Sequence, residues 1–285
     1  MMDRLFTPDQ ARQYVWKARI AGENIGIVPT MGALHEGHLS LVRESQKHCD
    51  VTIATIFVNP TQFAPHEDLQ SYPRTLEQDC ELLASHGASA VFIPEASMIY
   101  PAGFSTYVDP PEVGATLEGV CRPGHFRGVA TVVLKLFQIL PATHAFFGRK
   151  DYQQLKVIQA MVRDLNAGIN VVPCDTVREP DGLALSSRNR YLSPEQRQIG
   201  LQISKALRIA KNLVDSGEVE VDRVQDAMRS ELLGGGDASK AVDKIDYAVI
   251  VEADSLAPLE KIDRPAVALI AAFVGQTRLI DNAIL

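Results

Sequence analysis

Short apolar runs alternate with segments of helical periodicity through the first two-thirds of the chain. The run 25–28 is apolar throughout and predicts a buried strand, whereas 39–44 carries its apolar residues at helical spacing. This alternation continues to residue 175 and predicts a parallel sheet with helices on both faces, a Rossmann-like α/β fold. Strands are expected at 25–28, 51–58, 90–93, 144–148 and 169–175, and helices at 8–20, 39–44, 75–87, 129–140 and 152–165.

The pattern changes near residue 178, where a turn signal and a polar loop precede two amphipathic helices. We therefore predict two domains, a ligand-binding domain over 1–180 and a smaller α+β domain over 181–285 that closes over the active site. The second domain is expected to contain helices at 193–215 and 221–233 and strands at 244–251, 266–274 and 277–284.

Residues 94–127 form a long connection rich in Pro, Gly and Glu. A connection of this length inside a domain is usually functional or disordered. We therefore expect irregular structure there.

Charge and composition exclude some classes of protein. The formal net charge of −7 over 285 residues argues against a duplex nucleic-acid partner, which usually requires a basic surface. The four cysteines form no Cys-x-x-Cys pair, which favours reduced thiols in a cytoplasmic protein. We expect no targeting leader and no membrane span, because no apolar run is long enough.

Two histidines lie where the first strand turns into a helix. His35 and His38 are separated by a glutamate and a glycine, and residues at i and i+3 share one side of a helix. The first turn of a helix carries unpaired N–H groups and a positive partial charge, which suit a phosphate. The segment therefore predicts chemistry at a nucleotide phosphate.

Other interpretations of the histidine pair are weaker. A zincin needs histidines at i and i+4, and the chain nominates no third zinc ligand. The Walker lysine motif and the Gly-x-Gly-x-x-Gly fingerprint are absent, which disfavours P-loop hydrolysis and ordinary dinucleotide binding. Alone, a His-x-x-His pair is more often structural than functional.

Three further polar segments follow strands or lie in the linker. Gln62, after the second strand, offers a donor and an acceptor to a polar substrate, although a solvated amide is an equal alternative. A second strand-to-helix turn places a glycine, a lysine and an aspartate where a nucleotide would bind, with a glutamine one helical turn beyond the lysine. Two serines and an arginine in the linker suit triphosphate oxygens. These residues are Gly148, Lys150, Asp151, Gln154, Ser186, Ser187 and Arg188.

Six ordered motifs resemble one known family. The chain is similar to the pantothenate synthetases (pantoate–β-alanine ligases) of the His-x-Gly-His nucleotidyltransferase superfamily, and its signature is His35-Glu36-Gly37-His38. The resemblance spans the full length and is strongest between residues 25 and 192, but Arg149 stands where the family carries an acidic or amide residue. The motifs are Pro-Thr-Met-Gly-Ala-Leu-His-Glu-Gly-His, Phe-Val-Asn-Pro-x-Gln-Phe, Tyr-Pro-Arg, Arg-Pro-Gly-His-Phe, Phe-Gly-x-Lys-Asp-Tyr-Gln-Gln-Leu and Ser-Ser-Arg-Asn.

The resemblance implies an ATP-dependent ligase of pantothenate and coenzyme A biosynthesis. Pantoate would attack ATP to give pantoyl adenylate and pyrophosphate, and β-alanine would then displace AMP; Mg²⁺ would accompany the ATP phosphates, with no metal site on the protein. It also implies a homodimer, which the apolar helix 129–140 favours. The resemblance implies catalytic roles for His35, His38, Lys150 and Arg188, ATP contacts from Met31, His38, Gly148, Lys150, Asp151, Ser186, Ser187 and Arg188, and pantoate contacts from Gln62 and Gln154.

Two other functions remain open at this point. A related nucleotidyltransferase that uses a phosphorylated acceptor would share the histidine signature, but the paired glutamines favour a carboxylate substrate over a phosphate ester. A non-catalytic nucleotide sensor would keep the fold, yet every position of catalytic type is filled.

Overall fold

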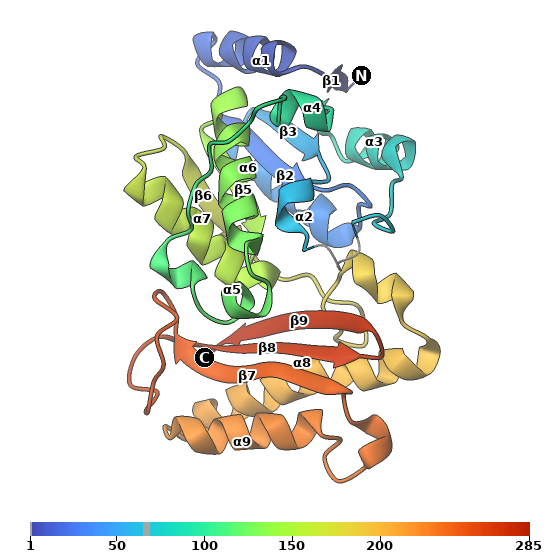
Figure 1. The fold of residues 1–285 in the computed structure, drawn as a ribbon, viewed down its shortest axis with the longest axis vertical. Coiled ribbons are helices and arrows are strands. Elements are labelled where there is room, and N and C mark those ends of the chain that lie inside the picture. The colour runs from blue at the N-terminus through green and yellow to red at the C-terminus, as the bar shows by residue number, and fades with distance from the viewer. Residues whose placement is uncertain (1, 65–68) are drawn as a thin grey trace. The chain divides into compact units, whose positions relative to one another are not determined.

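Residues 2–64 and 69–285 are described by the computed structural model of the chain (Figure 1). The contacts divide the chain into two units. The N-terminal unit comprises Met1–Arg149 and Gln153–Asp175, and the C-terminal unit comprises Lys150–Tyr152 and Thr176–Leu285. The division falls a few residues before the predicted boundary at 180 and places one short segment, 150–152, with the later unit.

A six-stranded sheet of parallel strand pairs forms the centre of the N-terminal unit, in the order β1-β4-β3-β2-β5-β6. The five predicted strands are present, and β1 adds an edge strand that the sequence pattern did not reveal. The strands are β1 (Asp3–Leu5), β2 (Ile25–Thr30), β3 (Val51–Ile56), β4 (Ala90–Phe92), β5 (His144–Gly148) and β6 (Asn170–Cys174).

Alternate residues of each strand enter two different cores. On β2, Ile25 and Ile27 pack into the core formed with α1, α6 and α7, whereas Val28 packs into the core formed with α2 and α3. Because the inner strands β2, β3, β4 and β5 are mostly buried on both faces, they are largely apolar and lack a polar alternation. The helices of this unit are α1 (Pro8–Ile20), α2 (Glu36–His48), α3 (Leu76–Ser85), α4 (Ala96–Ile99), α5 (Glu118–Cys121), α6 (His125–Ile139) and α7 (Tyr152–Asp164).

Helix boundaries follow local capping chemistry where a cap exists. Thr7 forms a capping box with Gln10 ahead of Pro8, which explains the start of α1 where the sequence predicted it. Helix α6 begins at His125, four residues before the predicted start. Its N-cap is Gly124, which adopts a left-handed conformation and has no side chain to form a cap, so the sequence shows no capping signal there. The long connection 94–127 is therefore less irregular than expected, since it contains α4 and α5.

The apolar character of α6 is satisfied inside the chain. Its residues Val129, Val133, Leu136 and Phe137 are buried in the core of the N-terminal unit. The hydrophobicity of this helix therefore does not require a second subunit, and the sequence argument for a dimer loses one of its two supports.

The C-terminal unit is a small α+β layer structure. Its antiparallel sheet has the order β7-β8-β9, and α8 and α9 lie along one face of it (Figure 1). On β8 the alternate residues Ala266, Ala268, Ile270 and Ala272 pack into the core shared with these helices. The elements are β7 (Lys244–Glu252), β8 (Ala266–Val274), β9 (Thr277–Ile284), α8 (Pro194–Asp215) and α9 (Val221–Leu232). The predicted fold class is confirmed.

Within 2–64 and 69–285, no helix combines the length and apolarity needed to cross a membrane.

Candidate active site

The strand order places a topological switch point between β2 and β5. From β2 the chain builds outward through β3 and β4 on one side and through β5 and β6 on the other. In open parallel sheets, ligands bind at such a point, beyond the carboxyl ends of the strands. Thr30 ends β2, and residues 31–38, which we call the histidine turn, lead from it into α2. Gly148 ends β5. The structure therefore brings Met31, the histidine turn and Gly148 to one edge of one sheet.

His35 and His38 form reciprocal contacts at the N-terminus of α2. His35 is the N-cap, and its Nδ1 accepts a hydrogen bond of 3.1 Å from the N–H of Gly37. The Nδ1 of His38 accepts from the N–H of His35 at 3.4 Å, and the two ring centroids lie 4.1 Å apart. Each ring therefore helps to satisfy the unpaired N–H groups of the first helical turn.

These contacts fit rings that carry their proton on Nε2. A ring nitrogen that accepts a hydrogen bond carries no proton, so the proton of each neutral imidazole is on Nε2. Each histidine thus presents an Nε2–H donor beside the positive end of α2. This arrangement suits a phosphate oxygen and does not require a charged imidazole.

Gln62 is held at the end of the 3₁₀ turn Pro60–Gln62 that follows β3. Its Nε2 donates to the Sδ of Met31 at 3.0 Å, and its Oε1 accepts from the Nδ2 of Asn59 at 3.1 Å. Asn59 is itself buried and accepts at Oδ1 from the hydroxyl of Tyr100 at 2.8 Å. The Gln62 amide is therefore fixed in orientation, and it joins the turns that follow β2 and β3.

Helix α6 packs closely against the turn that carries Gln62. A Cβ on Gly128 would lie 2.4 Å from the backbone oxygen of Thr61, so this approach requires a glycine. The Nδ1 of His125 lies 2.9 Å from the backbone oxygen of Gln62, and the Nε2 of His125 lies 3.1 Å from Nη1 of Arg122. The segment 122–128 therefore supports the turn Pro60–Gln62.

Nothing in the described protein around Gly148 requires a glycine. Its φ lies outside the left-handed region, and a Cβ built there meets no atom within 4 Å. The neighbouring Arg149 pairs with Asp175 at 2.6 Å between Nη1 and Oδ1. Arg149 therefore has an acidic partner within its own unit.

Lys150 and Asp151 belong to the C-terminal unit. The backbone oxygen of Lys150 accepts from Nδ2 of Asn282 on β9 at 2.8 Å, and its Nζ lies 3.7 Å from Oδ1 of Asp151. Both side chains are partly exposed. This hydrogen bond from Asn282 ties the backbone of Lys150 to β9.

The two neighbouring glutamines of α7 differ in their surroundings. Gln153 is buried and fastens the long connection, because it accepts from the N–H of Glu118 at 3.0 Å and donates to two backbone oxygens of residues 113–116. Gln154 is partly buried. Lys150 lies in the 3₁₀ turn Arg149–Asp151, which leads directly into α7, and Gln154 lies in the first turn of that helix.

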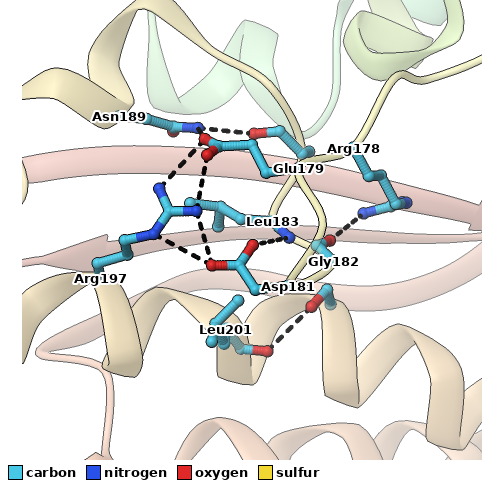
Figure 2. A network of polar contacts seen from close by, with 10 residues as sticks. Arg178, Glu179, Asp181, Gly182, Leu183, Asn189, Arg197 and Leu201 are labelled. Atoms are coloured by element: carbon cyan, nitrogen blue, oxygen red, sulfur yellow. Dashed lines mark hydrogen bonds and ion pairs between the residues drawn. The ribbon is translucent and has the colours of Figure 1, made fainter.

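The serine–arginine loop of the C-terminal unit is fastened by an ion-pair network (Figure 2). Ser186 caps the 3₁₀ turn Ser187–Tyr191, accepting at Oγ from the N–H of Arg188 at 3.3 Å. Asn189, at the centre of that turn, donates to Oε1 of Glu179 at 3.0 Å. The hydroxyl hydrogen of Ser186 can still donate to a ligand, since the cap uses only its oxygen.

Arg197 on α8 organises this network. Its guanidinium binds both carboxylate oxygens of Glu179, at 3.1 and 2.7 Å, and Oδ2 of Asp181 at 2.6 Å (Figure 2). Burial raises the pKa of Asp181, but the hydrogen bonds from Arg197 and from the N–H of Leu183 outweigh burial and hold the pKa below its ordinary value. The Asp181 carboxylate that pairs with Arg197 is therefore ionised at neutral pH.

Among residues 2–64 and 69–285, no three His, Cys, Asp or Glu side chains gather into a group that would hold a metal ion.

Comparison with known proteins gives the family. The sequence model of the family described as "Pantoate-beta-alanine ligase" matches residues 4–284. The chain belongs to the pantoate–β-alanine ligase family. The family predicted from the six motifs, and with it the enzyme class, a ligase, is confirmed.

Named relatives agree with this family over their full lengths. The chain is 51% identical to the pantothenate synthetase of Moorella thermoacetica over 284 residues, covering 100% of this chain and 99% of the relative. It is also 51% identical to that of Rhodopirellula baltica, over 99% of this chain and 98% of the relative.

Solved structures of the family share the fold. The crystal structure of pantothenate synthetase from Thermus thermophilus superposes with a TM-score of 0.92 at 41% identity, covering 99% of each chain. The pantoate–β-alanine ligase of Francisella tularensis superposes with a TM-score of 0.80 at 35% identity, covering 100% of this chain and 98% of that one. The Francisella structure is described as a complex with "Beta-gamma ATP" and β-alanine.

The sequence patterns of the ligase did not reveal two residues that hold the site in place, Asn59 and Asp79. Asn59 was visible within a motif, but nothing in the sequence showed that it is buried against Tyr100 and Gln62. Asp79, whose carboxylate accepts from the N–H groups of Ala33 and Leu34, gave no signal, since it lies in a polar stretch of a predicted helix. Asn59 binds Tyr100, and Asp79 binds the backbone of residues 33 and 34; these partners are distant in sequence, so local patterns do not contain the contacts.

Proposed function

We propose that this ligase condenses pantoate with β-alanine to give pantothenate, with cleavage of ATP to AMP and pyrophosphate through pantoyl adenylate. The observation that carries the proposal is the family match over residues 4–284. The paired histidines at the switch point, at the N-terminus of α2, support it because they offer phosphate donors where a nucleotide would bind.

In the first step, a carboxylate oxygen of pantoate attacks the α-phosphorus of ATP. The new P–O bond forms as the bond to the bridging oxygen breaks, and its electron pair leaves on pyrophosphate. Negative charge develops on the phosphate oxygens, and fixed donors and cations stabilise it without a covalent enzyme intermediate. We assign this role to the Nε2–H groups of His35 and His38 and to the cations of Lys150 and Arg188.

In the second step, the amine of β-alanine attacks the carbonyl carbon of pantoyl adenylate. The C–N bond forms, the bond from the acyl carbon to the phosphate oxygen breaks, and AMP leaves with that electron pair. The proton lost by the amine passes to water or to the departing phosphate.

We assign pantoate to the side-chain amides of Gln62 and Gln154. The Nε2 of Gln62 has two hydrogens, and one of them points to Met31, which leaves the second for the substrate. A neutral amide orients a carboxylate while leaving it nucleophilic, whereas a bidentate arginine would withdraw electron density from it. The fixed orientation of this amide supports the assignment, because a preorganised group binds at lower entropic cost.

The nucleotide contacts are assigned to both units. We propose that Met31 and Gly148 of the N-terminal unit contact ATP. We assign the ribose to Asp151, which belongs to the C-terminal unit. The absence of any need for a glycine at 148 within the described protein supports close approach of a ligand there.

We further propose that the C-terminal unit closes over the bound nucleotide. Ser186, Ser187 and Arg188 would then bind the phosphates. Their loop is held in place by the Glu179–Arg197 pair, which supports a role that needs fixed donors.

We propose that Mg²⁺ enters as the complex of ATP. Magnesium takes oxygen ligands and often uses substrate phosphates with one or two carboxylates. No group of three or more potential ligands gathers in the described ranges, which supports delivery on the phosphates over a protein cage. When bound, the ion would neutralise charge on the phosphate oxygens.

Assembly as a homodimer and a cytoplasmic location are proposed on the family resemblance. No disulfide joins the four cysteines, which suits a reducing compartment. A monomeric mass by light scattering at micromolar concentration would contradict the dimer.

The deciding experiment is exchange of labelled pyrophosphate into ATP, followed by AMP release. Exchange should require pantoate and not β-alanine, and AMP release should require both. Release that requires a phosphorylated acceptor would assign the chain to a related nucleotidyltransferase. ATP binding without exchange or release under any condition would indicate a sensor.

A further inference from the structure

Asp79 is a buried carboxylate whose partners are neutral groups. Its side chain lies on α3 and is 1% exposed. Its oxygens accept from the N–H of Ala33 at 2.9 Å, from the N–H of Leu34 at 2.8 Å and from the hydroxyl of Thr75 at 3.2 Å. Burying a charge is unfavourable unless hydrogen bonds compensate for the lost water, so these contacts are necessary for the ionised side chain.

The backbone that Asp79 binds has an unfavourable conformation. Gly32 and Ala33 both lie in the left-handed region, with φ of 79° and 50°. A glycine adopts this conformation readily, but an alanine does so only when its surroundings impose it. The carboxylate imposes it here, because charge-assisted hydrogen bonds to two successive N–H groups fix the path of the turn.

The turn leads directly into the histidine pair. Leu34 precedes His35, the N-cap of α2, and the ring of His35 is bound to the first turn of that helix. The ring of His38 is bound in turn to the backbone of His35. A shift of residues 33 and 34 would therefore move both Nε2 atoms, because the rings are fastened to the backbone that moves.

Thr75 supports the carboxylate and does not cap its helix. Thr75 is the N-cap residue of α3, but its hydroxyl makes no capping hydrogen bond and donates to Asp79, one turn along the helix. The hydroxyl of Thr75 thus holds the Asp79 carboxylate against the backbone of residues 33 and 34.

From this geometry we infer that Asp79 is a positioning residue of the adenylation step, which orients His35 and His38 through the backbone of residues 33 and 34. This inference rests on the proposed function. It assigns to α3 a role in the reaction although none of its side chains is placed against a substrate.

The test compares Asp79→Asn with a control on the same helix, Glu77→Gln. Asparagine has nearly the same shape, but its NH₂ group cannot accept, so at least one backbone N–H loses its partner. Glu77 is exposed and pairs with Arg4, away from the turn. We expect kcat for pyrophosphate exchange to fall about 10- to 100-fold in Asp79→Asn, with KM for ATP and pantoate changed less than about threefold, since small misplacements of catalytic groups have effects of this order.

The second readout is the ¹⁵N NMR spectrum of the histidine rings in the protein without substrates. In Asp79→Asn the ring nitrogens of His35 and His38 should shift, whereas those of His48, at the far end of α2, should not. Glu77→Gln should change neither the spectrum nor kcat. If Asp79→Asn fails to fold, Thr75→Val removes one donor and should give a smaller change of the same kind.

Two results would overturn the inference. One is a folded Asp79→Asn protein with the kcat of the unsubstituted chain, and the other is a loss of activity with unchanged histidine signals. If the unsubstituted chain shows no pantoate-dependent exchange, the proposed function fails, and the NMR comparison still decides whether Asp79 orients the rings.

Discussion

The two segments proposed to hold ATP are supported by different physical means. The histidine turn of the N-terminal unit depends on one buried carboxylate that binds neutral backbone groups. The serine–arginine loop of the C-terminal unit depends on ion pairs whose side chains remain partly exposed, with 28% exposure for Arg197, 26% for Glu179 and 33% for Asp181.

This difference predicts different responses to the solvent. Water and salt screen partly exposed charges, whereas a buried carboxylate is screened much less. The histidine turn should therefore keep its geometry over a wide range of conditions, and the serine–arginine loop should respond to acid and ionic strength. The histidine turn follows a strand of a parallel sheet that is buried on both faces. The serine–arginine loop is held mainly by its ion pairs with one helix, α8.

The largest effect is expected from His38→Ala. Loss of one donor to developing phosphate charge typically lowers the rate about 100- to 1000-fold, or about 3–4 kcal/mol, and pyrophosphate exchange would measure it. The matched control is His48→Ala on the last turn of the same helix, which should leave the rate unchanged. Near-normal exchange in His38→Ala would contradict the phosphate role of the turn.

A smaller effect is expected from Arg197→Leu in the C-terminal unit. The substitution leaves two partly buried carboxylates without their cation, and we expect a loss of about 1–2 kcal/mol in the free energy of unfolding, discounted for exposure. KM for ATP should rise about tenfold, because the loop is no longer fixed. Arg264→Leu, at an exposed pair, is the control and should leave the free energy of unfolding nearly unchanged. An Arg197→Leu protein with unchanged KM for ATP would separate the network from nucleotide binding.

A pH titration should reveal the charge dependence of the same network. The pKa of Asp181 is lowered from 3.8, so its contribution to stability is complete above that value and is lost as pH falls through the lower, folded-state pKa. Urea unfolding between pH 5 and the acid limit should show this loss, and Asp181→Asn should flatten the slope. A slope unaffected by Asp181→Asn would show that other carboxylates carry the acid sensitivity.

The smallest effect concerns a thiol of the N-terminal unit. Burial raises the pKa of Cys174 to about 12, so almost no reactive thiolate is present at pH 8. Iodoacetamide labelling of the native protein, read by mass spectrometry, should modify the exposed Cys121 first and leave Cys174 unmodified. Early modification of Cys174 would show that β6 opens more readily than a buried sheet should.

Much of the fold follows from local patterns. Apolar runs predicted five strands of the parallel sheet because both faces are buried, and the Thr7 and Ser193 caps gave the starts of α1 and α8. The three C-terminal strands were also predicted from their periodicity. The short edge strand β1 was missed, because three residues contain too little pattern and its partner β4 lies 87 residues further along the chain.

The same division applies to the site. The sequence by itself determined the family and the position of His35 and His38 between strand and helix, since both depend on residues close together in the chain. Only the tertiary structure decided that Asp79 reaches the 33–34 backbone, that Tyr100 binds Asn59, and that α6 buries its apolar side in its own unit. These contacts depend on which elements become neighbours, and that is set by the packing of the whole sheet.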